Sequence, residues 1–127
     1  MKNYQIIELE VKKSRFVSYY FEIENVEEIS LLLDKIKSQH KKAKHFCYAY
    51  ILKNPYQEKC SDDGEPNGTA GKPILNVLQK SHQINALVCV VRYFGGIKLG
   101  SGGLFRAYSK ATSLVVEKYT TSKKTIN

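Results

Sequence analysis

Long apolar segments are missing from this sequence of 127 residues. A helix that spans a membrane needs about 20 consecutive apolar residues, and no stretch approaches that length. No secretory signal opens the chain either, so we expect a cytoplasmic protein with no membrane partner. With 43% hydrophobic and 25% charged residues, the chain is expected to form one folded domain over residues 1–119, followed by a polar tail over 120–127.

Cysteines are also few, and their spacing does not pair them. The three residues, Cys47, Cys60 and Cys89, are an odd number without the spacing of a zinc site or a disulfide framework. Cys47 and Cys89 lie in apolar stretches, where free thiols act as small core residues in a reducing compartment. His45 stands two residues before Cys47, but two ligands without a second pair are a poor metal signature. We therefore expect no metal ligands here.

Acidic residues become scarce halfway along the chain. Residues 1–63 carry eleven Lys/Arg and ten Asp/Glu, whereas residues 64–127 carry nine Lys/Arg and only Glu65 and Glu117. The formal net charge of +8 therefore belongs almost entirely to the second half. A one-sided basic surface favours an anionic partner, of which nucleic acid is the commonest large one, although solubility alone explains the charge equally simply.

Hydrophobic periodicity predicts a sheet of four strands. Apolar and polar residues alternate over 4–11 and 15–23, as they do in strands with one buried face. The largely apolar stretch 44–52 predicts a third strand, in which His45 and Cys47 share one face. An uninterrupted apolar run over 87–91 is typical of a strand buried on both faces. The first two strands are expected to form an antiparallel hairpin.

Capping signals and helical spacing predict three helices. Asn25, followed by Glu28 three residues later, forms a capping box before the first helix. Pro73 is expected at the first position of a short second helix. A third helix follows with Leu104 and Tyr108 on its apolar face. Together with the strands, these helices predict an α+β fold.

The most distinctive stretch joins the buried strand to the last helix. Five of the nine residues from Gly95 to Gly103 are glycines, with Lys98 among them and Arg92 just before. Glycine lets a ligand approach the backbone, and the start of a helix presents free N–H groups and the positive end of the helix dipole. This combination predicts an anion-binding site. The candidate residues for anion or nucleic-acid binding are Arg92, Lys98, Gly100, Ser101, Gly102, Gly103, Arg106, Lys110 and, from an earlier loop, Lys72.

A long polar stretch, residues 54–72, contains almost nothing to bury. Loops of this length in a small domain are usually functional or disordered. Asp62, Asp63 and Glu65 form a candidate acidic site, which either holds Mg²⁺ through carboxylate oxygens or caps turns and pairs with basic residues. The stretch is not a P-loop, because Pro66 occupies the position of the first glycine. We expect it to lie beside the glycine loop at one end of the sheet, with no catalytic residue assigned and Mg²⁺ as the one candidate cofactor.

Four blocks of the sequence resemble the conserved blocks of the YigZ/IMPACT family. They are Ser14–Phe16, His45–Tyr50, Ser61–Leu75 and Val91–Lys110, and they follow the expected order over nearly the full chain. The resemblance implies an IMPACT N-terminal domain with a fold like domain 2 of ribosomal protein S5. Such a fold is a two-layer α+β sandwich in which helices pack on a four-stranded sheet. The resemblance also implies a cytoplasmic domain that acts near translation or RNA.

The sequence differs from longer members of that family. Bacterial members usually continue into a second, ferredoxin-like domain, and eukaryotic members carry a separate module through which they restrain a translation-initiation kinase. Neither segment is recognisable in these 127 residues. The kinase-regulating role is therefore not part of what the resemblance implies for this chain.

Two hypotheses about function follow, beside the simpler one of a scaffold whose loops only pack together. In the first, the chain is a non-catalytic RNA- or ribosome-associated regulatory domain that binds phosphate groups through the basic glycine loop. In the second, it is an enzyme that acts on a phosphorylated small molecule or nucleotide, with the same loop and a metal ion in the acidic stretch. We favour binding, because the three histidines are scattered and no nucleophile–base pair is visible.

Overall fold

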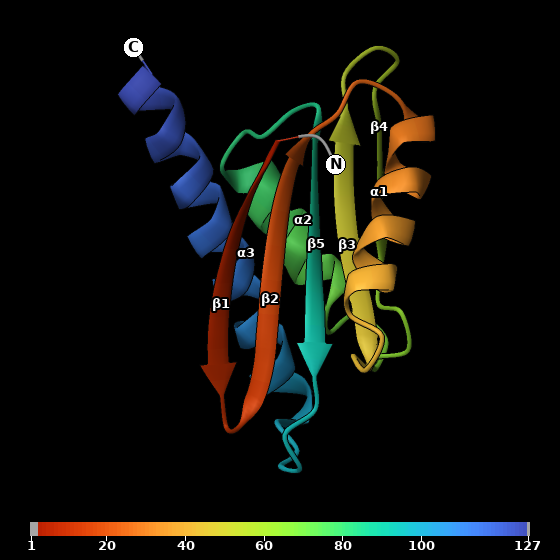
Figure 1. Ribbon diagram of the computed structural model, residues 1–127, viewed down its shortest axis with the longest axis vertical. Helices are drawn as coiled ribbons and strands as arrows, with labels where there is room; N and C mark the ends of the chain where they lie inside the picture. Colours follow the sequence, from red (N-terminus) through yellow and green to blue (C-terminus); the bar gives the residue numbers. More distant parts are fainter. Residues whose placement is uncertain (1–2, 127) are drawn as a thin grey trace.

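The computed structural model describes residues 3–126 and has an α+β fold in which three helices pack on one antiparallel sheet (Figure 1). The strands are β1 (Tyr4–Val11), β2 (Ser14–Glu22), β3 (His45–Leu52), β4 (Gln57–Ser61) and β5 (Ala86–Tyr93). The helices are α1 (Val26–Gln39), α2 (Gly71–Lys80) and α3 (Gly100–Ile126).

The strand order across the sheet is β1-β2-β5-β3-β4, and every neighbouring pair is antiparallel. The β1–β2 hairpin is confirmed. The central strand, β5, is buried from Ala86 to Arg92, as its continuous apolar pattern predicts. The register pairs Arg92 with His45 and Tyr93 with Arg15. The start of β2, the start of β3 and the end of β5 therefore lie at the same end of the sheet.

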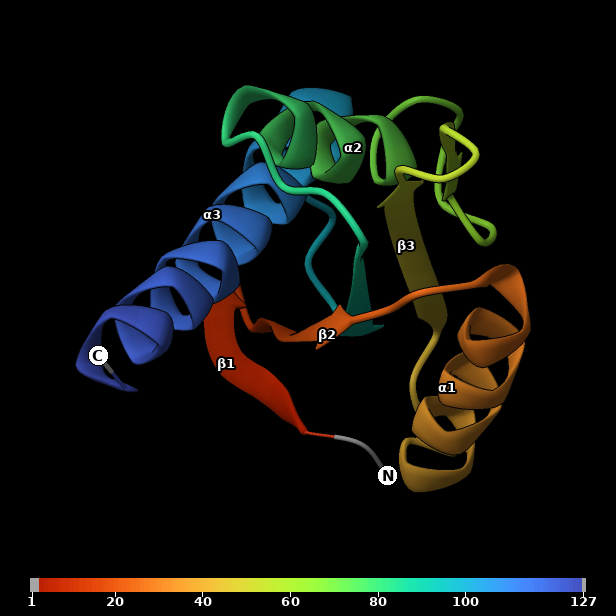
Figure 2. The ribbon, with the colours of Figure 1, turned by 90° about the horizontal axis from the view of Figure 1, so that it is seen from above.

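Helices cover both faces of the sheet (Figure 2). α2 and α3 lie on one face, where Tyr108 and Ala111 of α3 pack on β2 and β3 residues such as Phe16 and Cys47. α1 lies on the opposite face and buries Ile36 and its neighbours against β2, β3 and β5. The two-layer arrangement predicted from the resemblance is therefore wrong: the molecule has three layers, with the sheet in the middle. The likeness to ribosomal protein S5 stays a prediction.

The local signals for the helices are largely confirmed. The Asn25 side chain accepts from the Glu28 N–H and the Glu28 carboxylate accepts from the Asn25 N–H, which completes the capping box. Pro73 lies two residues into α2 instead of opening it, because α2 begins at Gly71. Cys47 and Cys89 are buried free thiols, as expected.

The sheet has five strands, not the four predicted. β4 lies within the polar stretch that was interpreted as a loop, and it pairs with β3 through backbone hydrogen bonds from Tyr48–Ser61 to Leu52–Gln57. Its side chains are mostly exposed, so it lacks the apolar alternation that reveals the other strands.

The predicted polar tail over 120–127 is helical as far as Ile126, and Asn127 lies outside the described residues. Tyr119 stacks on Tyr20 with ring centroids 4.0 Å apart, and the Lys123 ammonium lies 2.8 Å from the Glu22 carboxylate. These contacts attach the last turns of α3 to the sheet. Within residues 3–126, no helix combines the length and apolar character needed to cross a membrane.

Candidate functional site

The polar stretch and the glycine loop lie side by side at the end of the sheet where β5 finishes. This confirms the prediction that they meet. Together they enclose a cleft of about 370 Å³. Its walls come from the beginning of β3, from the polar stretch, from the end of β5 and from the beginning of α3. The lining residues include Lys44, His45, Glu65, Arg92, Phe94, Lys98, Gly100 and Ser101.

A buried ion pair forms the floor of this cleft. Nη1 of Arg92 donates to both carboxylate oxygens of Glu65, at 2.9 and 2.8 Å, and the two side chains are only 7% and 3% exposed. Nη2 of Arg92 donates to the Ser14 hydroxyl at 3.3 Å, and the guanidinium carbon lies 5.8 Å from the centroid of the Phe16 ring and 5.6 Å from that of the Phe94 ring. Arg92 is therefore held by the protein itself, and its charge is balanced by Glu65.

Tyr108 joins the same buried group from α3. Its hydroxyl donates to Oε2 of Glu65, and the thiol of Cys47 donates to that hydroxyl at 3.4 Å. Burial raises the pKa values of both the Tyr108 hydroxyl and the Cys47 thiol, because a low-dielectric surrounding disfavours the charged forms. Tyr108 thus stays a hydrogen-bond donor, and Cys47 stays an unreactive thiol.

His45 lines the cleft beside Glu65. The sequence did not predict this contact. Its Nδ1 lies 2.7 Å from the Asp63 carbonyl oxygen, which only accepts hydrogen bonds, so Nδ1 carries a proton. Its Nε2 lies 3.5 Å from Oε1 of Glu65. The strand pattern predicts that His45 and Cys47 share a face of β3, but Glu65 comes from a loop without periodicity, so the sequence does not predict that it lies beside His45.

The three candidate acidic residues have separate roles. Asp62 accepts hydrogen bonds from the backbone N–H groups of Gly68, Ala70 and Gly71, at 2.9 to 3.1 Å, and so caps the start of α2. Burial opposes the ionisation of Asp62, but these three donors outweigh it and hold the pKa of the carboxyl below its ordinary value.

Asp63 and Glu65 point to other partners. The Asp63 carboxylate accepts from the Phe46 N–H at 2.7 Å, while Glu65 pairs with Arg92. Across residues 3–126, no group of three or more His, Cys, Asp and Glu side chains is arranged to hold a metal ion. The carboxylates therefore organise the polar stretch, and binding of Mg²⁺ by this chain stays a prediction.

The glycines at the end of the loop belong to the helix. α3 starts at Gly100, whose φ of +74° is a conformation that favours glycine, and Ser101, Gly102 and Gly103 form its first turn. The first N–H groups of an α-helix lack partners inside the helix, and the first turn of α3 contains no acidic residue to satisfy them. Together with the exposed Lys98, this end of α3 gives the cleft one electropositive wall.

A second hollow, of about 230 Å³, continues the basic surface beyond Leu99. It is lined by Arg106 and Lys110 of α3 and by Lys12 of the β1–β2 turn. The sequence does not predict that this turn lies beside α3, because the contact depends on the tertiary fold. Lys72, in the first turn of α2, does not line the cleft.

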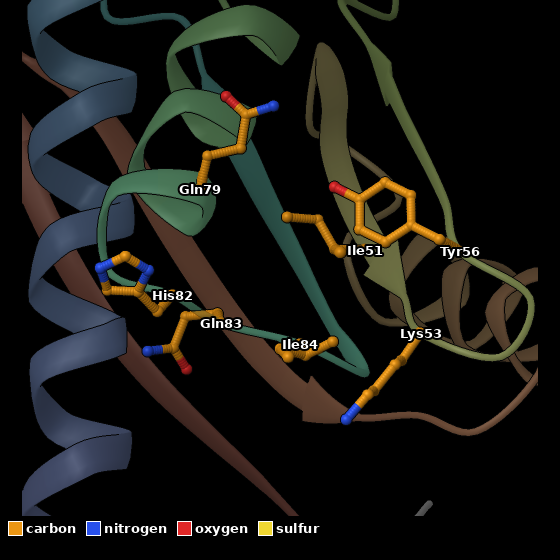
Figure 3. A pocket seen from close by; sticks show the side chains of 7 residues that line it. All are labelled: Ile51, Lys53, Tyr56, Gln79, His82, Gln83 and Ile84. Carbon is orange, nitrogen blue, oxygen red and sulfur yellow. The ribbon is translucent and has the colours of Figure 1, made fainter.

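The opposite end of the sheet has a hollow of a different kind (Figure 3). It lies beside the end of β3, and Tyr56, His82 and Ile84 border it together with Lys53. None of the residues predicted to bind anions lies there. It therefore supplies control positions for experiments on the cleft.

The fold and the cleft define a small α+β domain with an electropositive glycine-rich helix start beside a buried Glu–Arg pair. The model of the Impact N-terminal domain matches residues 12–116. The chain belongs to the IMPACT family.

Related proteins share this domain but are longer. The chain is 47% identical to the IMPACT family member YvyE of Bacillus subtilis over 84% of this chain and 49% of that protein. It is 40% identical to the IMPACT family member YigZ of Escherichia coli over 91% of this chain and 58% of that protein. The chain thus spans about half the length of the relatives it matches.

Two solved structures are similar. A crystal structure of a hypothetical protein has a TM-score of 0.85 and 37% identity, over 90% of this chain and 57% of the other. The structure of the two-domain translational regulator Yih1 has a TM-score of 0.64 and 22% identity, over 93% of this chain and 47% of the other. The second comparison shows a shared fold alone.

Proposed function

We propose that this chain is a non-catalytic RNA- or ribosome-associated regulatory domain that binds phosphate groups in the cleft at the start of α3. The observation that carries the proposal is the meeting of two exposed lysines, Lys44 and Lys98, with the N-terminus of α3 around one cleft. Lysines and helix N-termini are both common partners of phosphate oxygens.

An aromatic ring in the cleft favours nucleic acid over a simple anion. Phe94 is 48% exposed and lines the cleft beside the cationic wall. Single-stranded RNA is commonly bound by stacking unpaired bases on such rings while basic side chains follow the backbone. Arg106, Lys110 and Lys12 extend the basic surface past Leu99, which provides room for more than one phosphate.

The link to translation comes from similarity. Yih1, whose fold is shared, is described as a translational regulator. At 22% identity this description belongs to Yih1, and for our chain a place near the ribosome is part of the proposal. We favour binding over phosphoryl transfer because Asp62, Asp63 and Glu65, which an enzyme of that kind needs for its metal ion, are engaged with protein partners.

The test is the salt dependence of binding to single-stranded RNA. Each phosphate contact contributes a slope of about −0.7 to the plot of log affinity against log salt concentration. Replacing Lys98 by Ala or Arg106 by Ala is expected to weaken binding. Each change should make the slope less steep by the contribution of about one phosphate contact. Lys53→Ala, at the opposite end of the sheet, removes the same charge as Lys98→Ala and should leave the slope unchanged.

Two results would contradict the proposal. One is the absence of binding to RNA at low salt. The other is an equal effect of Lys53→Ala and Lys98→Ala, because it would mean that net charge alone, and no particular surface, attracts the RNA.

A further inference from the structure

We propose that Glu65 and His45 form a binding site for a sugar hydroxyl at the floor of the cleft, and that this site makes the cleft selective for ribonucleotides over deoxyribonucleotides. The inference rests on the proposed function, since it names which nucleic acid the cleft takes. The 2′-hydroxyl is the group by which a protein distinguishes RNA from DNA at a given site.

The carboxylate of Glu65 keeps room for one more hydrogen bond on the oxygen that faces His45. Oε2 accepts from Nη1 of Arg92 and from the Tyr108 hydroxyl, whereas Oε1 accepts only from Nη1 of Arg92 among the described residues. A carboxylate oxygen accepts about two hydrogen bonds. Oε1 is also the oxygen nearest to the imidazole of His45.

The imidazole presents its second nitrogen to the same place. Because Nδ1 donates to the Asp63 carbonyl, the orientation of the ring is fixed and Nε2 is the nitrogen left for a ligand. The 3.5 Å between Nε2 and Oε1 is longer than a good hydrogen bond. A hydroxyl oxygen placed about 2.8 Å from each atom is within hydrogen-bond distance of both. While Nδ1 carries the ring proton, both Nε2 and Oε1 are acceptors, so the hydroxyl donates its proton to one of them and separates the two.

Charge separates this floor from the phosphate-binding wall. Glu65 and Arg92 balance each other's charge at the floor, so an anion is attracted instead to the wall formed by Lys98 and the first turn of α3. The floor suits a neutral hydroxyl, because carboxylates are common acceptors for ribose hydroxyls. With Phe94 beside the same cleft, the three parts of one nucleotide each have a partner: phosphate at the wall, sugar at the floor and base on the ring.

The experiment compares three single strands of one sequence: RNA, DNA and 2′-fluoro RNA. The fluoro strand keeps the sugar conformation of RNA but has no hydroxyl to donate, so it separates hydroxyl recognition from backbone shape. We expect the unmodified protein to bind RNA about tenfold more tightly than either of the other strands, which is the gain expected from one hydrogen bond to a charged group.

Two variants assign the selectivity to the floor. His45→Ala is expected to weaken RNA binding and to lower the ratio of RNA to DNA affinity, because it removes one of the two partners of the hydroxyl and the atom that defines the site beside Oε1. Lys98→Ala should weaken the binding of all three strands by a similar factor and leave that ratio unchanged, because it removes a phosphate contact. Circular dichroism checks that each variant is folded, and the comparison of strands on the unmodified protein needs no variant at all.

Equal affinity for RNA and DNA would overturn this inference and leave the proposed function standing. Binding of the 2′-fluoro strand as tightly as RNA would also overturn it, since shape would then explain the preference. A ratio unaffected by His45→Ala would do the same. Failure to bind any of the three strands would overturn the proposed function, and this inference with it.

Discussion

Gly95 lies so close to the backbone of Lys13 that a Cβ atom at Gly95 would come within 2.0 Å of the Lys13 carbonyl oxygen. The contact is between two backbones, so no side-chain rotation can relieve it. It fixes the glycine loop against the β1–β2 turn. Lys12 is brought by this turn to the hollow that Arg106 and Lys110 line on α3.

We predict that Gly95→Ala destabilises the fold strongly. Because the added methyl group overlaps backbone atoms, either the loop or the turn has to move, and the free energy of unfolding should fall by about 3 kcal/mol or more. Urea denaturation followed by circular dichroism measures this change.

Gly96→Ala is the matched control. Gly96 has a φ of +88°, but nothing lies within 4 Å of its added Cβ, so only the backbone conformation is penalised. We expect a loss of about 1 kcal/mol. Equal losses for the two variants would show that the contact with Lys13 does not hold the loop.

Asp62→Ala tests whether the acidic stretch is structural. The substitution leaves the N–H groups of Gly68, Ala70 and Gly71 without their acceptor, and loss of such a cap costs about 1–2 kcal/mol of stability. Thermal and urea denaturation should both show it. Asp34→Ala, on the exposed side of α1, is the control and should change stability by less than about 0.5 kcal/mol.

Magnesium distinguishes this structural role from a catalytic one. A ligand that binds only the folded state raises the melting temperature with its concentration. We expect no such rise in millimolar Mg²⁺. A rise that disappears in Asp62→Ala would contradict the structural role and favour the enzyme hypothesis.

His40, the C-terminal cap of α1, is predicted to make stability fall at acidic pH. Its Nε2 lies 2.6 Å from the Tyr19 hydroxyl, and its Nδ1 contacts the Tyr93 hydroxyl. Burial lowers the pKa of His40 below its ordinary value of 6.5, and the Arg15 cation lowers it further. Below pH 6.5 the unfolded chain therefore binds more protons than the folded one, and the contribution of this group to stability is lost as the pH falls.

The measurement compares melting temperatures at about pH 7.5 and about pH 5.5. We expect the unmodified protein to lose more stability over this interval than His40→Gln does. His82→Gln replaces an exposed histidine and should behave as the unmodified protein. If His40→Gln loses as much as the unmodified protein, another group is responsible.

The sequence predicts those elements whose side chains are buried on a regular period. β1, β2, β3 and β5 each show the alternation or the apolar run that a packed sheet requires, and the capping box before α1 is local. β4 lacks such a signal because it is held by backbone hydrogen bonds at an exposed edge. The last turns of α3 were missed for a similar reason: Tyr119 and Lys123 are fixed by Tyr20 and Glu22, far away in the sequence.

The candidate site was predicted in outline. Glycines before a helix and a basic second half led to Lys98 and the start of α3, because those signals are local. The pairing of Arg92 with Glu65 and the position of His45 depend on the register of β3 and β5, which no short segment encodes. Whether these residues bind nucleic acid stays a prediction for the experiments above.

The central place of β5 in the sheet has a consequence for the order of folding. The hairpins β1–β2 and β3–β4 each pair strands that are neighbours in the sequence. No strand of one hairpin is paired with a strand of the other. β5 is the last strand to appear in the sequence, yet it alone joins them, through pairs as distant as Arg15 with Tyr93. Contacts between distant segments form slowly, because the loop between them must first be closed. We therefore expect β5 to pair with the two hairpins late in folding, and the cleft to form only after that strand has inserted between them.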